Sequence, residues 1–434
     1  MASENSGEPR TPEWPAAGGR MRPRHHLAVS AYWFATNLHW GALLVVVMPS
    51  EVARRVAPAW SAQALSAVLG VGALVALATP PIVGAWSDRC ASRWGRRRPY
   101  LAVGVTVNLL GLLALWTAGN LRSFWLYLLA YLVVQLGNNI ATGAYTGVIP
   151  DLVPLAQRGE ASGYMAVMTQ TGTVIGAFAS GYLMGAGRVA ASYLVIALTL
   201  VLFAGITVAG IREQPSVRPS DRLAWGRLLR SLWLDPRRHP DFAWVWLTRA
   251  LVTMGMWCVQ PYIQYYLRDV MGVRNPEQTT GSLLGMILIG ATLTGYWGGR
   301  LSDRVGRKPV IYVANGVIAG ASLAFLFSRS LTVTFVIGAI YGLGFGAYYS
   351  VDWALGCDVL PDLKDAAKDL GVWHIAMVLP QSLAPFLAGP LLARLGRSAV
   401  PGQYGLAGYS AIFGLGAAFL ALGAVLLRNV RGAR

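Results

Sequence analysis

The chain has 434 residues, of which 55% are hydrophobic and 13% are charged, whereas an average soluble domain has about 25% charged residues. Together with a mean hydropathy of +0.48, this excludes a disordered chain, a collagen and a disulfide-rich secreted scaffold, and indicates a protein that folds in lipid. The net charge of +17 does not indicate nucleic-acid binding, because the basic residues form short clusters between apolar runs, where membrane proteins carry topology signals.

The first segment, residues 1–27, is polar, rich in Pro and Gly, and basic toward its end. A secretory signal would place a basic region directly before an apolar one, so we expect a flexible cytoplasmic tail. The three cysteines, Cys90, Cys258 and Cys357, are far apart in the sequence. Their spacing predicts neither a disulfide framework nor a metal site, and we expect no cofactor.

Twelve apolar stretches follow, each long enough to cross a hydrocarbon core of about 30 Å as a helix. We expect them at residues 28–49, 61–86, 99–118, 123–149, 162–186, 189–211, 242–267, 279–299, 309–328, 331–357, 371–393 and 405–427. With both termini inside, the inner segments hold 26 Lys and Arg residues and the outer loops hold 9. This bias predicts a multi-pass protein of the cell membrane with both termini in the cytoplasm.

The two halves of the chain repeat the same motifs. Gly84-Ala-Trp-Ser-Asp88-Arg89 precedes Gly95-Arg-Arg-Arg-Pro99, and Gly299-Arg-Leu-Ser-Asp303-Arg304 precedes Gly306-Arg-Lys-Pro309. Asp151-Leu-Val-Pro154 similarly matches Asp358-Val-Leu-Pro361. We therefore predict an all-α membrane protein with twelve transmembrane helices in two pseudo-symmetric six-helix bundles. The expected bundles are residues 28–211 and 242–427, joined by a cytoplasmic linker, 212–241, and followed by a cytoplasmic tail, 428–434.

The paired loops resemble the signature loop of the major facilitator superfamily. The longer first copy, with Asn138-Asn139 and Val351-Asp352, resembles the sucrose-transporter and glycoside-cation symporter branch more specifically. The resemblance implies a major facilitator fold with a substrate site between the halves near mid-membrane. In the linker, apolar residues at helical spacing are compatible with a helix on the membrane face or with a plain covalent connection.

Charged residues of the repeated motifs form a candidate cytoplasmic gate. Carboxylates at helix ends can pair with neighbouring Arg side chains when the inner side closes, and must separate from them when it opens. The alternative is that these charges are only topology anchors. The gate candidates are Asp88, Arg89, Arg96, Arg97, Asp151, Asp303, Arg304, Arg307 and Asp358.

Three ionisable residues inside the expected spans are candidates for proton coupling. Asp352 is the only carboxylate well inside a span, and an ionisable group at that depth indicates a functional site. It either takes and releases a proton or forms a static ion pair with Arg249, which enters the membrane from the same side. His39, in the middle of the first span, either relays protons or is bonded to a neighbouring helix.

Polar and aromatic residues inside the spans are candidates for substrate binding. Amides both donate and accept hydrogen bonds, as a polyol requires, and aromatic faces can cover a sugar ring. About half of these residues should instead bond neighbouring helices or lie in interface belts. The candidates are Asn37, Trp40, Gln135, Asn138, Asn139, Gln170, Trp257, Gln260, Tyr348, Tyr349 and Gln381.

The sequence departs from its relatives where coupling matters. Thr146 stands where plant sucrose transporters carry an Arg in the fourth helix, and the second and fourth spans lack the aspartates of sodium-coupled melibiose-type symporters. Sodium coupling is therefore disfavoured, and proton coupling has to rest on Asp352 or His39.

The preferred hypothesis is a proton-linked secondary transporter of a sugar or glycoside, with import slightly favoured over export. The alternatives are a proton-linked exporter of drug-like or apolar compounds and, less favoured, a transport-inactive sensor or a membrane enzyme. Walker A, HExxH and GxSxG motifs are absent from the sequence, so we expect no enzyme. The expected partners are a small-molecule substrate, the proton and the lipid bilayer, with no nucleic acid, and we expect a monomer.

Overall fold

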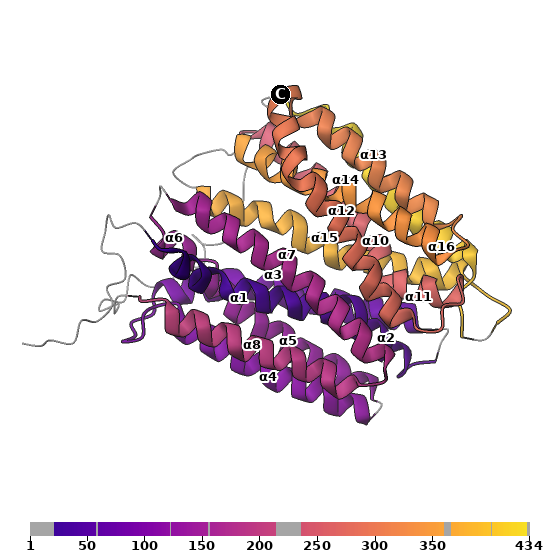
Figure 1. Cartoon of the computed structure of the whole chain (residues 1–434), viewed down its shortest axis with the longest axis horizontal. Helices are drawn as coiled ribbons and strands as arrows, with labels where there is room; N and C mark the ends of the chain where they lie inside the picture. Colours follow the sequence, from indigo (N-terminus) through magenta and orange to yellow (C-terminus); the bar gives the residue numbers. More distant parts are fainter. Residues whose placement is uncertain are drawn as a thin grey trace, which may run out of the picture.

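The structure is a computed structural model that describes residues 21–57, 60–121, 123–154, 157–213, 236–359, 366–400 and 402–431. It is built of long helices that run side by side in two groups (Figure 1). Residues 214–235 of the linker, for which the sequence leaves a helix and a plain connection open, lie outside the described residues. The predicted fold class, an all-α membrane protein of two six-helix bundles, is confirmed.

The first bundle contains six successive helical segments, which we call paths because some consist of more than one helix. They follow the expected spans closely. They are α1 (Pro23–Ala42) continued by the π-helix η1 (Leu43–Val47) and α2 (Met48–Ala53), α3 (Ser61–Asp88), α4 (Arg98–Asn120), α5 (Phe124–Tyr145) with the short α6 (Val148–Leu152), α7 (Arg158–Gly185) and α8 (Val189–Gly210). The first helix begins several residues earlier than predicted because Pro23 occupies its first turn, where the fixed φ of proline favours helix initiation.

The second bundle repeats this order. It contains α10 (Pro240–Val259) continued by the 3-10 helix η4 (Gln260–Tyr262) and α11 (Ile263–Asp269), then α12 (Pro276–Val305), α13 (Arg307–Phe325), α14 (Leu331–Asp358), α15 (Ala366–Leu395) and α16 (Leu406–Leu427). The first path of each bundle is thus interrupted by irregular helix, η1 in one and η4 in the other, and the two interruptions are in contact. Such irregular turns often mark functional positions.

Ten of the described helical paths are long and apolar enough to cross a membrane. The other two predicted spans correspond to α7 and α12, which are richer in Gly, Ser and Thr. These two helices pack against each other across the bundles, and α3 packs against α15 in the same way. At Gly281 of α12 an added Cβ would lie 2.5 Å from the carbonyl oxygen of Ala177 in α7. The lower hydropathy of these helices therefore reflects close backbone packing between bundles.

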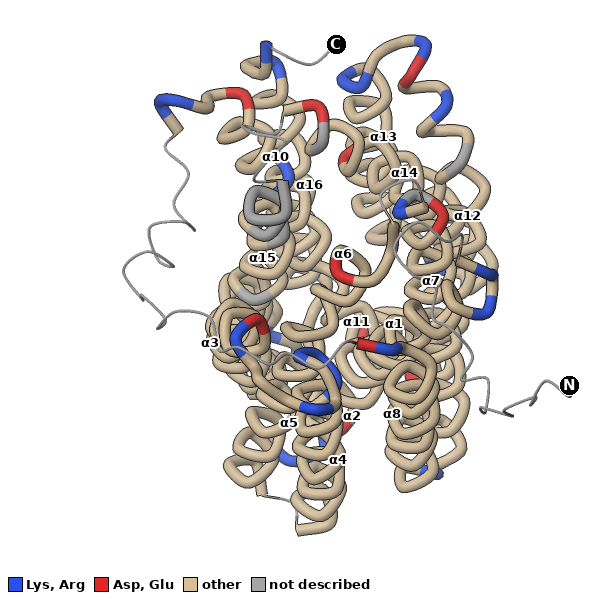
Figure 2. The backbone as a smooth tube through the Cα atoms, turned by 90° about the vertical axis from the view of Figure 1, so that its left-hand side faces the viewer, with Lys and Arg blue, Asp and Glu red and all other residues tan. Residues whose placement is uncertain are grey.

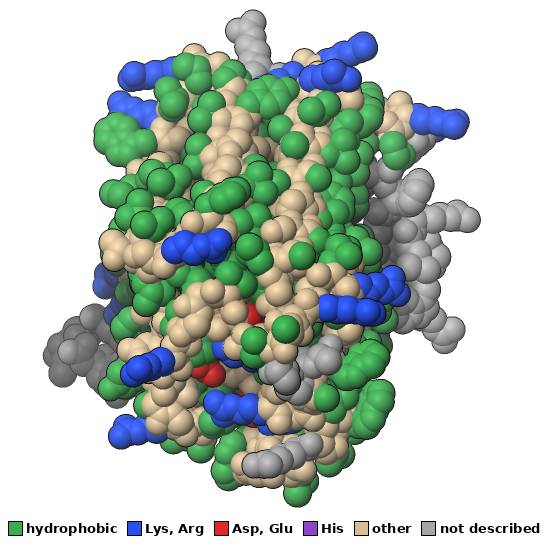
Figure 3. All heavy atoms as spheres, turned by 90° about the vertical axis from the view of Figure 1, so that its right-hand side faces the viewer, with side chains coloured by type: hydrophobic (Ala, Val, Ile, Leu, Met, Phe, Trp, Pro, Cys, Tyr) green, Lys and Arg blue, Asp and Glu red, His purple; other side chains and the backbone are tan. Residues whose placement is uncertain are grey.

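The two ends of the molecule differ in charge. We call the end that carries the repeated loops, residues 88–98 and 303–307, the signature end, and the other the opposite end. At the signature end acidic and basic residues gather at helix ends and connections (Figure 2). At the opposite end hydrophobic side chains are spread over the whole face, and acidic side chains show only in a small area beside Lys and Arg (Figure 3).

Candidate functional site

In the first bundle, Arg97 links the end of α3 to the short helix α6. Its Nη2 lies 2.5 Å from Asp88 Oδ1, and its Nε lies 2.8 Å from Asp151 Oδ2. Its Nη1 also donates to Ser87 Oγ at 3.1 Å. Burial lowers the pKa of Arg97, but the hydrogen bonds and charges of Asp151 and Asp88 more than offset this and raise it. Arg97 therefore stays charged and holds three segments of the bundle together.

Arg307 makes the equivalent contacts in the second bundle. Its Nη1 lies 2.5 Å from Asp303 Oδ1 and its Nε lies 3.2 Å from Asp358 Oδ2. The same Nη1 donates to Ser302 Oγ at 2.6 Å. Each of these ion pairs joins segments of one bundle rather than the two bundles, so this structure shows the pairs that brace each half.

The remaining gate candidates are placed less uniformly. Arg96 lies 2.6 Å from Asp151 Oδ1 and so joins the first cluster. Arg89 donates to the carbonyl oxygen of Ala85 at 2.8 Å, and Arg304 is exposed in the last turn of α12. The structure thus brings most of the gate candidates into two clusters, while their role as a gate stays a prediction.

Sequence reasoning missed Glu213, which follows α8. Its carboxylate accepts hydrogen bonds from the backbone N–H groups of Arg97, at 3.0 and 3.1 Å, and of Arg98, at 3.1 Å. These groups begin α4, so Glu213 caps that helix from a distant segment. The loop needs glycine at Gly95, which has a φ of +94° and approaches Glu213 closely. Only the fold brings these positions together, because they are more than a hundred residues apart.

The coupling candidates Arg249 and Asp352 form a buried ion pair between α10 and α14. Arg249 Nη1 donates to Asp352 Oδ2, and each side chain is only 5% exposed. Tyr348 donates to the second carboxylate oxygen, Oδ1, at 3.1 Å. From α15, the Trp373 ring lies 4.5 Å from the Arg249 guanidinium. Both predicted partners therefore meet, in a desolvated setting where one unpaired charge would be costly.

Two further carboxylates, Glu51 and Asp269, have buried side chains just outside the predicted spans. The first path continues to Ala53 and the seventh to Asp269, beyond the predicted ends. Glu51 is therefore buried and lies 2.5 Å from Arg55 Nη2, and Asp269 is buried beside Arg268. Both lie near the opposite end, whereas Asp352 lies on the signature side of its helix.

His39 is buried in a polar network of the first bundle. Its Nδ1 lies 3.2 Å from Asn108 Nδ2, and Asn138 Oδ1 accepts from Thr36 at 3.0 Å. The ring of Trp40 stacks against His39 with centroids 4.5 Å apart. Asn108 was not among the sequence candidates, since a lone Asn in an apolar run carries no motif. The network joins α1, α4 and α5.

The substrate candidates are spread over helices of both bundles. Asn139 donates to Gln135 Oε1 at 2.9 Å, and Asn37 donates to Thr169 of α7 at 3.4 Å. Asn138 and Tyr348 are buried in the contacts described above, whereas Gln170 is exposed. The side chains that are partly exposed are Asn37, Trp40, Asn139, Trp257, Gln260, Tyr349 and Gln381. Their role in binding stays a prediction.

Polar contacts between the bundles gather at the opposite end, in a set that we call the seam. Gln264 donates to Ser50 Oγ at 2.6 Å, and Ser50 Oγ lies 3.2 Å from Glu277 Oε1. Arg54 Nη2 is 3.8 Å from the same Glu277 oxygen. The seam continues with hydrogen bonds that pair Tyr265 with the carbonyl of Pro49, Tyr262 with Ser66 and Tyr404 with Ser61. The bundles are therefore closed on each other at this end.

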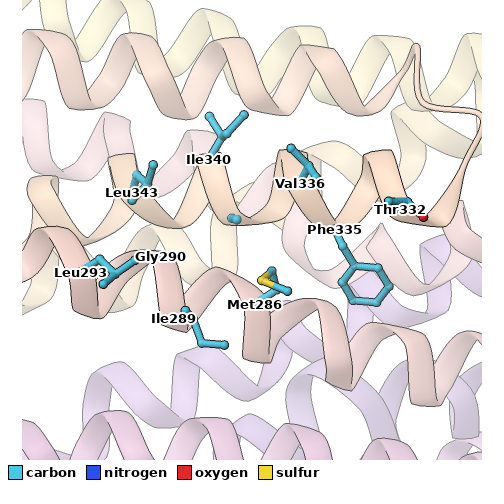
Figure 4. Close-up of a pocket in the computed structure, with 10 residues that line it drawn as sticks. Met286, Ile289, Gly290, Leu293, Thr332, Phe335, Val336, Ile340 and Leu343 are labelled. Atoms are coloured by element: carbon cyan, nitrogen blue, oxygen red, sulfur yellow. The ribbon is translucent and has the colours of Figure 1, made fainter.

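An open apolar groove lies between α12 and α14. It has a volume of about 520 Å³, and Figure 4 shows that its lining comes from Met286, Ile289 and Leu293 of α12 and from residues of the neighbouring α14 that include Phe335 and Val336. Its lining is almost wholly apolar, so it lacks the donors and acceptors that would orient a polar solute.

The structure therefore consists of two helical bundles that are braced by equivalent ion pairs at one end and joined by a polar seam at the other. The family model of the Major Facilitator Superfamily matches residues 26–385 and 277–433. The chain belongs to the Major Facilitator Superfamily.

Curated relatives place it near sucrose transporters. Sucrose transport protein SUT1 of Oryza sativa subsp. japonica is 23% identical over 80% of this chain and 79% of its own. The multi-drug resistance efflux pump PmrA of Streptococcus pneumoniae is 24% identical, with 80% of each chain covered. For Protein ZINC INDUCED FACILITATOR 1 of Arabidopsis thaliana, 27% identical, the match spans 35% of this chain and only about a third (32%) of that protein.

Solved structures agree on the fold. A bacterial homologue of the human lysosomal transporter Spinster, in an inward-facing and occupied conformation, superposes with a TM-score of 0.70 at 16% identity, covering 94% of this chain and 97% of that one. A D-xylose-proton symporter gives a TM-score of 0.68 at 13% identity, covering 94% and 98%.

Proposed function

We propose that this protein moves a small polar solute, a sugar or glycoside, across the cell membrane by alternating access, in symport with protons. The observation that carries the proposal is the buried pair of Arg249 and Asp352. When an intramembrane carboxylate that is paired with an arginine takes up a proton, the ion pair is broken. Proton binding is thereby linked to helix movement.

Support for a sugar comes from two sources. The similarity to sucrose transport protein SUT1 extends over 80% of the chain. Partly exposed amides and aromatic rings on helices of both bundles offer the donors, acceptors and flat faces that bind sugars. This chain has Thr146 where plant sucrose transporters carry an Arg in the fourth helix. Coupling would therefore differ from the plant arrangement, and Asp352 is the preferred coupling group.

The seam supports a particular conformational state. Because its contacts hold the bundles together at the opposite end, and the ion pairs of the signature end lie within single bundles, substrate would enter or leave this state at the signature end. The excess of Lys and Arg at that end supports a cytoplasmic location for it, and in this proposal both termini lie on the same side. The transporter would act as a monomer.

The test is transport by purified protein in liposomes that enclose a pH-sensitive dye. Addition of a sugar from a panel should acidify the lumen in the wild type, and Asp352→Asn should abolish the proton signal while sugar binding persists. Glu160→Gln, a change at an exposed carboxylate of α7, serves as the matched control and should retain the signal. Sugar-evoked proton entry that survives in Asp352→Asn would refute coupling through Asp352.

A second candidate is proton-linked export of apolar compounds. It is favoured by the similarity to the efflux pump PmrA over 80% of both chains. Cells that express the protein would then gain resistance to apolar toxins, and liposomes would show no proton movement with any sugar. The two readouts separate the candidates.

A further inference from the structure

We propose that a small cavity between α10, α13, α14 and α16 is a water-binding site through which Asp352 exchanges its proton. The inference rests on the proposed function, because it concerns the same carboxyl group. The inference adds a water-binding site that includes α13, a helix to which neither Arg249 nor Asp352 belongs.

The cavity is of the right size and has the right lining. Its volume for a water centre is about 10 Å³, and about 10–15 Å³ is what one water molecule needs. Asp352 and Tyr348 of α14 line it, together with Thr248 of α10 and Asn315 of α13. A buried water also needs two to four polar partners, and these four side chains supply them.

Asn315 is the observation that points to a ligand. Its side chain is 2% exposed and lines the cavity. Among the described residues, neither its Oδ1 nor its Nδ2 has a hydrogen-bond partner. A buried amide without partners is destabilising by about 1–3 kcal/mol per group, and a water molecule in the cavity would accept from Nδ2 and donate to the carboxylate.

The cavity lies on a different side of the ion pair from α15. Trp373 and Met377 of α15 contact the Arg249 guanidinium, whereas Asn315 of α13 and Gly423 and Leu427 of α16 line the cavity at Asp352. The charged or titratable groups near Asp352 are Arg249 from α10 and Tyr348 and Tyr349 from α14. The lining from α13 and α16 does not titrate, so Asn315 orients water without carrying charge.

The proton step balances within this site. A hydronium ion in the cavity gives one proton to a carboxylate oxygen of Asp352, which leaves a neutral carboxyl group and one water molecule. The charge-assisted bond to Arg249 then weakens to an ordinary hydrogen bond. Asn315 keeps its own protons and holds the water through hydrogen bonds only.

Infrared difference spectroscopy of purified protein in lipid nanodiscs tests this without any substrate. The protonated carboxyl band that is absent from Asp352→Asn identifies the group, and its hydrogen–deuterium exchange is timed after transfer to D₂O. Asn315→Leu should slow this exchange by about tenfold, the change expected when one hydrogen-bonded relay partner is lost. Asn315→Ser, which keeps a hydroxyl beside the water, should exchange at the wild-type rate.

Ser322→Ala is the matched control, because Ser322 is a buried residue of α13 whose hydroxyl bonds the carbonyl of Ile318. It should exchange like the wild type. Equal exchange in wild type and Asn315→Leu would overturn the water site and leave the proposed function standing. No Asp352 carboxyl band at any pH would overturn coupling through Asp352 and the water site with it. If Asn315→Leu does not fold, slower exchange in Asn315→Ala than in Asn315→Ser supports the site, and equal rates overturn it.

Discussion

Arg97 and Arg307 make the same three kinds of contact in the two halves of the chain. Each binds the Ser-Asp pair at the end of the second helix, Ser87-Asp88 or Ser302-Asp303, and an aspartate at the end of the fourth path, Asp151 or Asp358. The two clusters are not equally buried, since the Arg97 side chain is 7% exposed and that of Arg307 is 20% exposed. The repeat in the sequence is therefore a repeat of side-chain geometry, with the more buried copy in the first bundle.

This difference predicts unequal effects of removing the two arginines. Arg97→Ala should lower the free energy of unfolding by about 1.5–3 kcal/mol, because it removes charge-assisted hydrogen bonds made by a buried guanidinium. Arg307→Ala should cost about 0–1 kcal/mol, because its partners are largely exposed. Chemical denaturation in detergent micelles measures both. Equal losses would show that burial does not distinguish the two clusters.

Variants of the Arg249–Asp352 pair can distinguish a structural role of the pair from a role in proton coupling. Arg249→Met should destabilise the protein by about 3–5 kcal/mol, since a carboxylate then lies buried without its partner. The double variant Arg249→Met with Asp352→Leu should recover most of that stability, because apolar side chains replace a buried pair at little cost. Thermal unfolding measures this, and the proton-coupled signal should be lost in both variants. Coupled transport by the double variant would show that the pair is only structural.

The seam predicts that the closed state depends on close packing of α3 against α15 at the opposite end. An added Cβ at Gly389 of α15 would lie 1.6 Å from Ser66 Oγ of α3, which is closer than packed side chains allow, so Gly389→Val should push the two helices apart and lower the rate of transport in liposomes. Gly414→Val in α16 is the matched control, because an added Cβ at Gly414 would meet nothing within 4 Å, and it should transport like the wild type. Undiminished transport by Gly389→Val would contradict the dependence of the cycle on this contact.

The burial of the Glu213 carboxyl group predicts that the free energy of unfolding depends on pH. Burial raises the pKa of Glu213, and hydrogen bonds from the backbone N–H groups of Arg98 and Arg97 offset this only in part. Because the native state holds the proton more tightly than the unfolded state, this contribution to stability is present below the unfolded pKa and is lost as pH rises through the raised native pKa.

In Glu213→Gln that particular loss should disappear, since the amide does not titrate. The free energy of unfolding, measured by denaturant titration from acidic to neutral pH, should fall less with rising pH than in the wild type. Glu160→Gln serves as the comparison at an exposed carboxylate and should follow the wild type. An unchanged slope in Glu213→Gln would contradict this assignment.

Much of the architecture could be predicted from the amino-acid sequence alone. Apolar runs of membrane length determine the helices, and the repeated motifs around Asp88 and Asp303 relate the halves, because both signals are local in the chain. The same reasoning identified Asp352 and Arg249, since an ionisable residue in an apolar run needs a partner.

The tertiary structure alone decided which side chains meet. Glu213 reaches Arg97, and Asn315 lies beside Asp352, although the sequence marks neither Glu213 nor Asn315 with a motif. The seam around Glu277 joins residues more than two hundred positions apart. Helix formation depends on neighbours in the chain, whereas these contacts depend on how the helices pack and how the bundles tilt. The sequence therefore determined the helices and their repeat, and the packing determined the polar contacts on which a transport cycle would depend.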